Sequence, residues 1–362
     1  MKIEAVDVAH YHVPLPVPLS DSTHGIITHF DLVVVHIRDT DGADGFGYTY
    51  TVGAGGDAIR SLCENDLKPT LIGADADAIE AIWQKNWWHL HYVGRGGAVS
   101  FAMAAIDVAL WDLKAKRAKL PLYRFLGGDD PAVSAYVGGV DLQFPTDKLI
   151  AQASEAIAGG IRAIKMKVGR ARLAEDIERV AAMRAHIGPD ITLMADANMI
   201  WRMDEAIRAA RALATYDLFW IEEPTIPEDV AGHTRIVRDG GLPVATGENF
   251  HSIHEFARFI EAEAVSFPEP DAATLGGVTP WLKVAHLAEA NNLPVTTHGI
   301  HDLHVHLLAA VPNSSYLEIH GFSLNRFLEE PLRIEEGKAH APDRPGHGIL
   351  LDFRRLTEHR AG

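Results

Sequence analysis

The sequence is short of cysteine and of positive charge, and both deficits narrow what the protein can be. Cys63 is the single cysteine among 362 residues, so no intrachain disulfide can form and we expect a reducing compartment. Lysine and arginine total 33 against 49 aspartates and glutamates, which gives a formal charge of −16. This balance disfavours binding to nucleic acids or to anionic membrane surfaces.

Long hydrophobic runs and nucleotide-binding glycine patterns are also absent. No apolar run approaches the ~18 residues of a membrane span, and residues 1–14 lack the apolar core of a secretory signal. No GxGxxG follows a first strand and no GxxxxGK[ST] occurs. With 47% hydrophobic and 23% charged residues, the chain is expected to be a soluble, cytoplasmic protein with a sizeable core.

Hydrophobic patterns divide the chain into three expected regions. Residues 1–130 are predicted to form an α+β capping domain, because segments with strand-like alternation are followed by segments with helical spacing. The predicted strands are 3–13, 31–37 and 45–51, and the predicted helices are 57–72, 75–92 and 97–118. Residues 131–320 alternate short β runs with amphipathic helices. Residues 321–362 are rich in proline and glycine, so we expect an irregular segment that packs back on the capping domain.

The middle region holds eight β runs separated by helices, at 133–138, 163–168, 192–197, 218–223, 243–247, 264–267, 294–298 and 316–319. Alternating β and α segments imply parallel strands joined by crossover helices. Eight such units over about 190 residues predict a TIM-like (β/α)7–8 barrel. Periodicity alone leaves an open doubly wound sheet as the alternative.

Charged side chains close successive predicted strands of this region. In chain order they are Lys165 and Lys167, then Asp196, Glu222, Glu248, Asp271, His298 and Glu318. The gaps from Lys167 onward are 20 to 29 residues, about one β/α unit each. Active sites of such barrels lie at the carboxyl ends of the strands, so we expect these groups to share one mouth.

The three consecutive carboxylates Asp196, Glu222 and Glu248 point to a metal ion. Gathering several carboxylates at one site is unfavourable without a cation. Oxygen-only ligands suit Mg²⁺, with Mn²⁺ as a substitute, whereas Zn²⁺ prefers nitrogen or sulfur. The sequence therefore predicts a Mg²⁺ site at the mouth.

Acid–base groups flank the predicted metal. Lys165 and Lys167 are two apart on a strand, so both should point inward, and their mutual repulsion should lower a lysine pKa toward that of a general base. Asp271 and His298 end neighbouring strands, where the carboxylate would orient the imidazole as an acid or base.

The strand-end segments closely resemble the mandelate racemase subgroup of the enolase superfamily. The resemblance rests on KMK, DAN, EEP, GEN, PDA with GGVT, TTH and YLE, and it covers essentially the whole chain. In VGRGG, AIDVALWDLKAKRA and DLHVHLLAAVP the sequence is most similar to the galactarate and talarate dehydratases of this subgroup. The resemblance implies an enolase fold and an even-numbered homo-oligomer.

The resemblance also implies roles for the mouth residues. The metal would hold the substrate carboxylate and stabilise the enediolate formed when the α-proton leaves. Lys167 would be the base on one face, assisted by Lys165. His298, oriented by Asp271, would serve the opposite face.

Four further residues are expected to contact substrate. Glu318 would hydrogen-bond a carboxylate oxygen and Asn198 a hydroxyl, both by resemblance. His24 belongs to a polar loop, residues 20–30, that suits a polyhydroxy chain, and its alternative is an ordinary solvated loop. His320 shares a strand face with Glu318, so it is expected near the same substrate.

Acid–base groups on both faces of the substrate permit more than one reaction. We expect dehydration of an aldonate or aldarate sugar acid to a 2-keto-3-deoxy acid. The alternatives are a 2-hydroxyacid racemase or epimerase, which exchanges the α-proton without losing water, and a sugar-lactone cycloisomerase. A non-catalytic metal or sugar-acid binding module is disfavoured because each catalytic position holds a competent residue.

Overall fold

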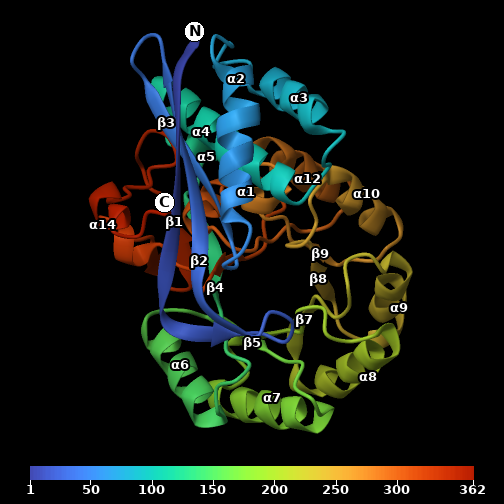
Figure 1. Cartoon of the computed structure of the whole chain (residues 1–362). Helices are drawn as coiled ribbons and strands as arrows, with labels where there is room; N and C mark the ends of the chain where they lie inside the picture. Colours follow the sequence, from blue (N-terminus) through green and yellow to red (C-terminus); the bar gives the residue numbers. More distant parts are fainter.

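The N-terminal region folds around an antiparallel three-stranded sheet. The computed structural model describes residues 1–362, and in it β1 (Ile3–Ser20) pairs with β2 (Ile26–Asp39), which pairs with β3 (Asp44–Thr51). β1 and β2 are longer than predicted, and the turn between them reaches down over the barrel (Figure 1). There the Ser22 hydroxyl donates to the carbonyl of Ala197 at 2.7 Å.

Helices cover one face of this sheet, and their bounds are α1 (Gly56–Ser61), the π-helical turn η1 (Leu62–Leu67), α2 (Lys68–Leu71), α3 (Ile79–Leu90), α4 (Ala98–Arg117) and α5 (Leu122–Phe125). The predicted helix 57–72 is thus continuous but contains a π-helical turn. α4 lies close against β3 because Gly47 has no side chain; a Cβ there would stand 2.2 Å from the Ala105 carbonyl.

Residues 132–319 form the predicted barrel of parallel strands, which are β4 (Ala132–Gly138), β5 (Ala163–Lys167), β6 (Thr192–Asp196), β7 (Leu218–Glu222), β8 (Val244–Thr246), β9 (Phe267–Pro268) and β10 (Leu317–Ile319). Neighbours in this order pair in parallel from β4 to β9, and β10 returns to pair with β4. The barrel expectation is confirmed, and the open sheet is wrong.

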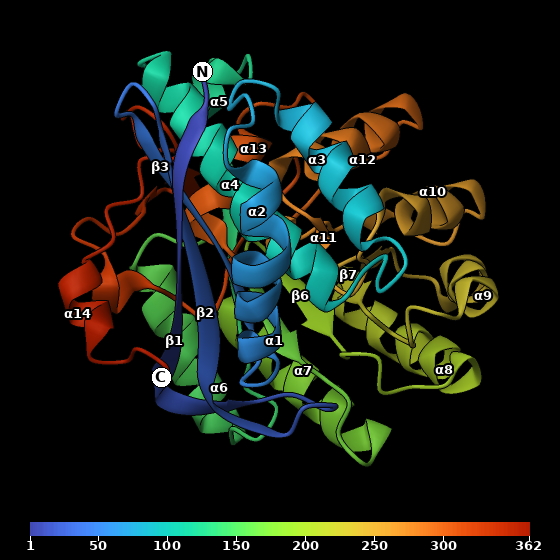
Figure 2. The ribbon, with the colours of Figure 1, turned by 45° about the horizontal axis from the view of Figure 1, so that its top comes forward.

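Helices surround the strands on the outside, as Figures 1 and 2 show for α6 to α10. Their bounds are α6 (Thr146–Ala158), α7 (Leu173–Ile187), α8 (Met203–Leu213) with the 3₁₀ turn η2 (Ala214–Tyr216), α9 (Val230–Gly240), α10 (Ile253–Glu261), α11 (Ala272–Leu275), α12 (Val278–Ala290) and α13 (His301–Leu308). None of the helices combines the length and apolar character needed to cross a membrane.

The predicted strand 294–298 is not a regular strand. Its only ladder contact is a single bridge between Val295 and Ser314. Proline explains the weak pairing, because Pro268 on the neighbouring β9 has no amide proton to donate. The segment still lies beside β9, since the Thr296 amide donates to the Pro268 carbonyl at 3.0 Å. The barrel ring is therefore closed by seven strands and one extended segment.

The last region contacts both the capping sheet and the barrel. It contains the 3₁₀ turn η3 (Asn325–Phe327), the hairpin β11 (Arg333–Glu335) and β12 (Lys338–His340), and α14 (Phe353–Thr357). The sequence analysis did not predict this hairpin, whose strand β12 pairs antiparallel with β4 of the barrel. Phe327 and Leu356 pack with Tyr11 and Phe30 of the capping sheet. Division of the chain at residues 130 and 320 remains our proposal.

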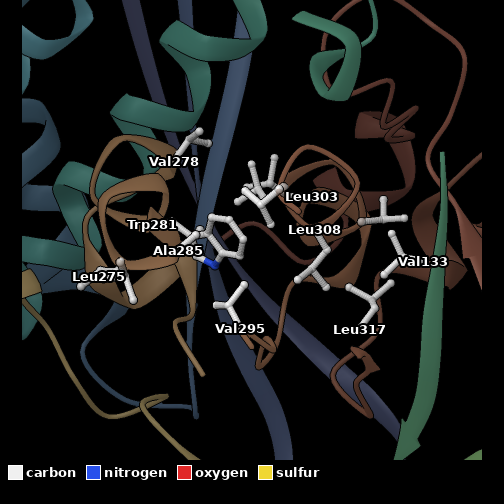
Figure 3. Packing of buried hydrophobic residues seen from close by; sticks show 14 of the residues in the cluster. Val133, Leu275, Val278, Trp281, Ala285, Val295, Leu303, Leu308 and Leu317 are labelled. Atoms are coloured by element: carbon white, nitrogen blue, oxygen red, sulfur yellow. The ribbon is translucent and has the colours of Figure 1, made fainter. Parts of the chain in front are cut away.

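The largest apolar cluster lies between the barrel and the helices α12 and α13, and Figure 3 shows it from close by. Trp281 is fully buried at its centre, beside Val278, Leu303 and Leu308. Its indole nitrogen donates to the Pro270 carbonyl at 3.0 Å. This bond fixes the turn that follows β9, where one of the predicted site residues stands.

Candidate active site

The barrel strands bring the predicted charged residues into one layer. In the strand register Lys167 lies opposite Asp196, and Asp196 lies opposite Glu222. One layer below them, Met194 and Trp220 fill the barrel interior. Strand alternation explains this arrangement, because every second residue points inward.

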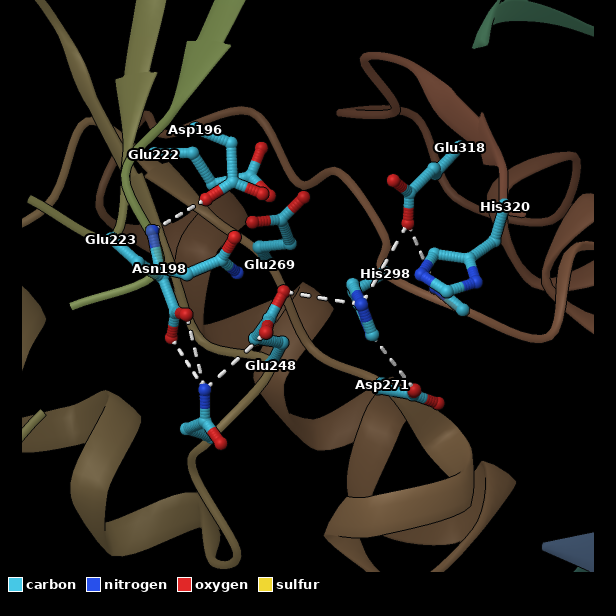
Figure 4. Close-up of polar contacts among 12 residues, drawn as sticks. Asp196, Asn198, Glu222, Glu223, Glu248, Glu269, Asp271, His298, Glu318 and His320 are labelled. Atoms are coloured by element: carbon cyan, nitrogen blue, oxygen red, sulfur yellow. Dashed lines mark hydrogen bonds and ion pairs between the residues drawn. The ribbon is translucent and has the colours of Figure 1, made fainter. Parts of the chain in front are cut away.

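Three carboxylates meet at this layer. Oxygen atoms of Asp196, Glu222 and Glu248 all lie within 4.8 Å of one another (Figure 4). Asp196 and Glu222 are fully buried, and the Glu248 side chain is 10% exposed. Glu248 Oε2 is buried without a hydrogen bond and faces His298 Nε2 at 3.2 Å. A set of hard oxygens that includes an unsatisfied one fits a divalent cation such as Mg²⁺.

Both lysines point into this carboxylate cluster. Lys165 pairs closely with Glu222, and its Nζ lies 2.8 Å from Glu318 Oε1 and 3.4 Å from Asp196 Oδ2. Lys167 Nζ lies 2.5 Å from Asp196 Oδ2. As predicted from the strand period, Met166 points the other way and packs in the helix-facing cluster.

With the carboxylates not neutralised by a cation, the lysine pKa values shift in the opposite direction to the one expected beside a metal. Burial alone would lower the pKa of Lys167 and Lys165 opposes its charge, but the Asp196 carboxylate outweighs both and raises the pKa above its ordinary value. For Lys165, burial is likewise outweighed by Glu222 and Glu318, so its pKa is raised as well. The sequence placed these carboxylates in the same mouth, but the expectation assumed that a metal would neutralise them.

Asp271 and His298 form the predicted pair. Nδ1 of His298 lies 3.2 Å from Asp271 Oδ2, and Figure 4 shows the ring between Asp271 and Glu248. Burial would lower the pKa of His298, but Glu248 and the hydrogen bond to Asp271 raise it to about 9. Asp271 is held in turn by the Ala273 amide, which donates to Oδ1 at 2.8 Å.

Glu318 and His320 stand beside His298. Glu318 Oε2 accepts from the Gly299 amide at 3.1 Å, and burial is outweighed chiefly by Lys165, so the Glu318 pKa is lowered. The rings of His320 and His298 meet edge to face with centroids 4.8 Å apart. His320 is buried, and its Nδ1 accepts from the Phe322 amide at 3.0 Å.

Asn198 is buried beside the carboxylate cluster, whereas His24 lies at the rim of the mouth. Asn198 has a left-handed backbone with φ of 44°, and its side-chain Oδ1 is buried without a hydrogen-bond partner. His24 lines the cavity described below, and its Nδ1 lies 2.9 Å from Asp21 Oδ2. The loop around His24 is therefore part of the mouth.

The structure adds polar groups that the sequence interpretation did not select. The Tyr50 hydroxyl, at the end of β3, donates to Asp271 Oδ2 at 2.9 Å. Asn249 Nδ2 donates to Glu223 Oε1 at 2.8 Å beside the carboxylate cluster. Glu269 is fully buried below it and accepts from the Tyr136 hydroxyl at 3.3 Å. Strand period from Asp271 could have indicated Glu269, whereas no local pattern marks Tyr50.

A cavity of about 450 Å³ opens above these groups between the barrel and the capping region. His298 and Glu248 form its floor, and Tyr50, Val52 and Phe101 of the capping region form its wall. The volume suits a small organic ligand. None of its fifteen lining residues is lysine or arginine.

A capped (β/α) barrel with an acidic cluster and acid–base groups at its mouth defines an enolase-type protein. Residues 3–127 match the mandelate racemase / muconate lactonizing enzyme N-terminal domain, and residues 148–355 match the enolase C-terminal domain-like family. The chain belongs to the enolase superfamily, mandelate racemase subgroup, and is an enzyme of that superfamily.

Curated and solved relatives extend this similarity over the whole chain. The 3,6-anhydro-alpha-L-galactonate cycloisomerase of Streptomyces coelicolor is 54% identical over 98% of both chains. The L-talarate/galactarate dehydratase of Salmonella typhimurium is 36% identical over 99% of this chain and 91% of its own. The crystal structure of a racemase from Streptomyces coelicolor A3(2) with bound magnesium aligns with a TM-score of 0.97 at 53% identity, covering 99% and 100%.

Proposed function

We propose that the protein is a Mg²⁺-dependent cycloisomerase that opens the ring of an anhydro sugar acid. The main support for this proposal is the 54% identity, over 98% of both chains, to a 3,6-anhydro-alpha-L-galactonate cycloisomerase. The sequence alone favoured loss of water from an open-chain sugar acid. This relative moves ring opening from an alternative to the first choice.

Both reactions need the same first two events. A base removes the proton on C2, next to the carboxylate, and the C3–oxygen bond then breaks as the electron pair forms a C2–C3 double bond. The departing oxygen takes a proton, and the resulting enol becomes a ketone at C2 when C3 is protonated. If the oxygen on C3 is a hydroxyl, water leaves; if it belongs to a 3,6-anhydro ring, it stays in the molecule and the product is an isomer.

The residues of the mouth can supply these proton transfers. Lys167 stands on β5 as the base, and His298 enters from the far side of the ring of strands to protonate the departing oxygen. Asp271 orients His298 through the 3.2 Å contact to Nδ1, which leaves Nε2 facing the mouth. Lys165 is placed to bind the substrate carboxylate. Glu318, 2.8 Å from Lys165, would hydrogen-bond that carboxylate only as the protonated acid, and the negative charge of the substrate would raise the Glu318 pKa in that direction.

Asp196, Glu222 and Glu248 would hold the metal. When bound, Mg²⁺ would neutralise these carboxylates, release Lys167 from Asp196, and supply positive charge beside the substrate carboxylate as the α-proton leaves. The buried and unpaired Asn198 Oδ1, beside the carboxylate cluster, would accept from a substrate hydroxyl, and His24 and His320 are proposed as further contacts.

The cavity lining supports a substrate with one carboxylate. An aldarate carries a second carboxylate at its far end, which calls for a cation or several donors to bind it. The lining offers no lysine or arginine for that group; its donors are histidines and neutral side chains such as Thr51 and Asn249, and its capping side is largely apolar, with Val52, Ala54, Ile59 and Phe101. A compact ether ring with few hydroxyls suits this wall better.

Dehydration remains the second candidate, because the 36% identical relative is an L-talarate/galactarate dehydratase. The test compares kcat/KM for an anhydro sugar acid, an open-chain aldonate and an aldarate with saturating Mg²⁺, using 2-keto acid formation as the readout. We expect the anhydro acid to be the best substrate. A preference for the aldarate would replace our proposal with dehydration, and α-proton exchange without keto acid would indicate a racemase or epimerase.

A further inference from the structure

A second cluster of metal-ligating side chains lies in the capping sheet, away from the carboxylates of the barrel mouth. His10 and His12 stand on β1, and Asp31 lies directly opposite His12 on β2. One ligand atom from each of these three residues lies within 4.8 Å of the others. We call this set the His10–His12–Asp31 cluster.

The distances within the cluster are close to those of a bound ion. Asp31 Oδ1 lies 3.2 Å from His10 Nε2 and 2.6 Å from His12 Nδ1. Neighbouring ligands of a tetrahedral ion with 2.0 Å bonds stand about 3.3 Å apart. The His10–Asp31 pair already has this spacing, and the His12–Asp31 pair, whose histidine side chain is 54% exposed, would need to open by less than 1 Å.

His10 supplies an independent observation. Its side chain is 1% exposed, and its Nε2 is buried without a hydrogen bond although it faces Asp31. On the other side of the ring, Nδ1 lies 3.3 Å from Asp57 Oδ1 and donates to it when it carries the proton. In that tautomer Nε2 has a lone pair directed toward a carboxylate oxygen, an arrangement that a cation between the two atoms would stabilise.

The surroundings of the cluster also match those of metal sites. Metal-bound histidines usually donate their second ring nitrogen to a carboxylate, and metal-bound carboxylates accept a further hydrogen bond. Asp57 takes the first role. Thr51 takes the second, because its hydroxyl donates to Asp31 Oδ2 at 3.2 Å. The ring of His29 lies 6.0 Å from that of His12, edge to face.

We propose that His10, His12 and Asp31 bind a transition-metal ion of the Zn²⁺ class, separate from the site at the barrel mouth. Two imidazoles and one carboxylate favour Zn²⁺ or Co²⁺ over Mg²⁺, which prefers oxygen ligands. The ion would join β1 and β2, and through Asp57 the start of α1. The segment from Thr51 to Asp57 contacts the cluster at both ends, and Val52, Ala54 and Gly55 within it line the mouth cavity, so the ion would brace that wall.

The test measures Zn²⁺ bound per full-length chain after metal removal, with Mg²⁺ kept saturating. We expect one Zn²⁺ per wild-type chain and none in His12→Gln. Because the His12 side chain is 54% exposed, this substitution should leave the fold intact. His36→Gln is the matched control. His36 lies on β2 an odd number of residues from Asp31, so its side chain points to the other face of the sheet, where it contacts Phe46 and Phe353. The His36→Gln variant should retain the ion.

Three further measurements make the result decisive. Asp57→Asn should weaken Zn²⁺ binding about 10–100-fold, the usual effect of losing an outer partner. Co²⁺ should give the visible absorption of a four-coordinate site in the wild type and not in His12→Gln. Equal Zn²⁺ content in wild type and His12→Gln would overturn the proposal. So would Zn²⁺ that is lost in Glu222→Gln but kept in His12→Gln, because that ion lies at the barrel mouth.

Discussion

The Tyr50 hydroxyl donates a 2.9 Å hydrogen bond to Asp271 Oδ2, which joins the capping sheet to the acid–base pair of the barrel. The same oxygen of Asp271 lies 3.2 Å from His298 Nδ1, so Tyr50 and His298 share one acceptor. β3 is fixed in this position because the Thr49 hydroxyl donates to the Ala273 carbonyl at 2.8 Å. The capping region thus contributes directly to the orientation of His298.

Tyr50→Phe should lower kcat by about tenfold while the protein stays folded. The ring remains in its apolar cluster, and the lost hydroxyl leaves Asp271 with one donor fewer to hold its position. The matched control is Tyr48→Phe, two residues earlier on β3, because the buried Tyr48 hydroxyl has no hydrogen-bond partner. Steady-state kinetics of both variants check this, and equal kcat values would show that Tyr50 plays no part in positioning.

Lys167→Ala and His298→Asn should separate the two proton transfers. Lys167→Ala should lose about 10²–10⁴-fold in both α-proton exchange with D₂O and product formation, because the base is gone. His298→Asn should lose product formation by a similar factor while Lys167 still exchanges the α-proton. The measurement is ¹H NMR of substrate and product. Lys148→Ala, at an exposed position of α6, is the surface-lysine control. Loss of exchange in His298→Asn but not in Lys167→Ala would reverse the assignment.

Metal removal should abolish turnover, and Mg²⁺ should restore it, with Mn²⁺ as a working substitute. Glu222→Gln replaces one of the three clustered carboxylates and should raise the Mg²⁺ concentration needed for half-maximal activity at least tenfold. Titration of chelated enzyme with Mg²⁺ checks both expectations. Full activity in the presence of excess chelator would contradict the proposed site.

Asp107→Asn should change how stability depends on pH. Asp107 on α4 accepts from the amide and hydroxyl of Thr279 on α12, and burial raises its pKa to about 7. The unfolded carboxyl titrates near 4, so the folded state binds the extra proton between the two values. The stabilisation by this group is therefore complete below about pH 4 and is lost as pH rises through about 7.

The measurable quantity is the unfolding free energy of wild type minus that of Asp107→Asn, from urea denaturation at pH 5 and pH 8. We expect this difference to fall by about 2–4 kcal/mol over that interval. Asp190→Asn, at an exposed position, is the control and should show no such trend. A difference that is the same at both pH values would contradict a buried titrating Asp107.

The barrel and the strand-end residues were predictable because their signals are local. Alternation places Lys165 and Lys167 on one face of a five-residue strand, and a regular β/α period puts Asp196 and Glu222 in the same layer. The family resemblance, which the comparisons confirm, depends on these same positions.

Features that depend on docking between distant segments were not predictable. Tyr50 reaches Asp271 across 221 positions of sequence, through a packing of β3 on α11 that no local pattern encodes. The 2.5 Å contact between Lys167 and Asp196, which raises the Lys167 pKa when no cation neutralises the carboxylate, is a side-chain distance that strand spacing does not give. The missing strand at 294–298 follows from its proline-containing neighbour β9.

The central claim is that the mouth removes a C2 proton and expels a ring oxygen that stays in the product. Its most direct test is ¹H NMR and mass spectrometry of the reaction with a 3,6-anhydro sugar acid and Mg²⁺ in D₂O. We predict a 2-keto-3-deoxy product that carries one deuterium at C3 and otherwise has the mass of the substrate. Recovery of the anhydro acid with deuterium at C2 and an intact ring, and no keto product, would contradict the account.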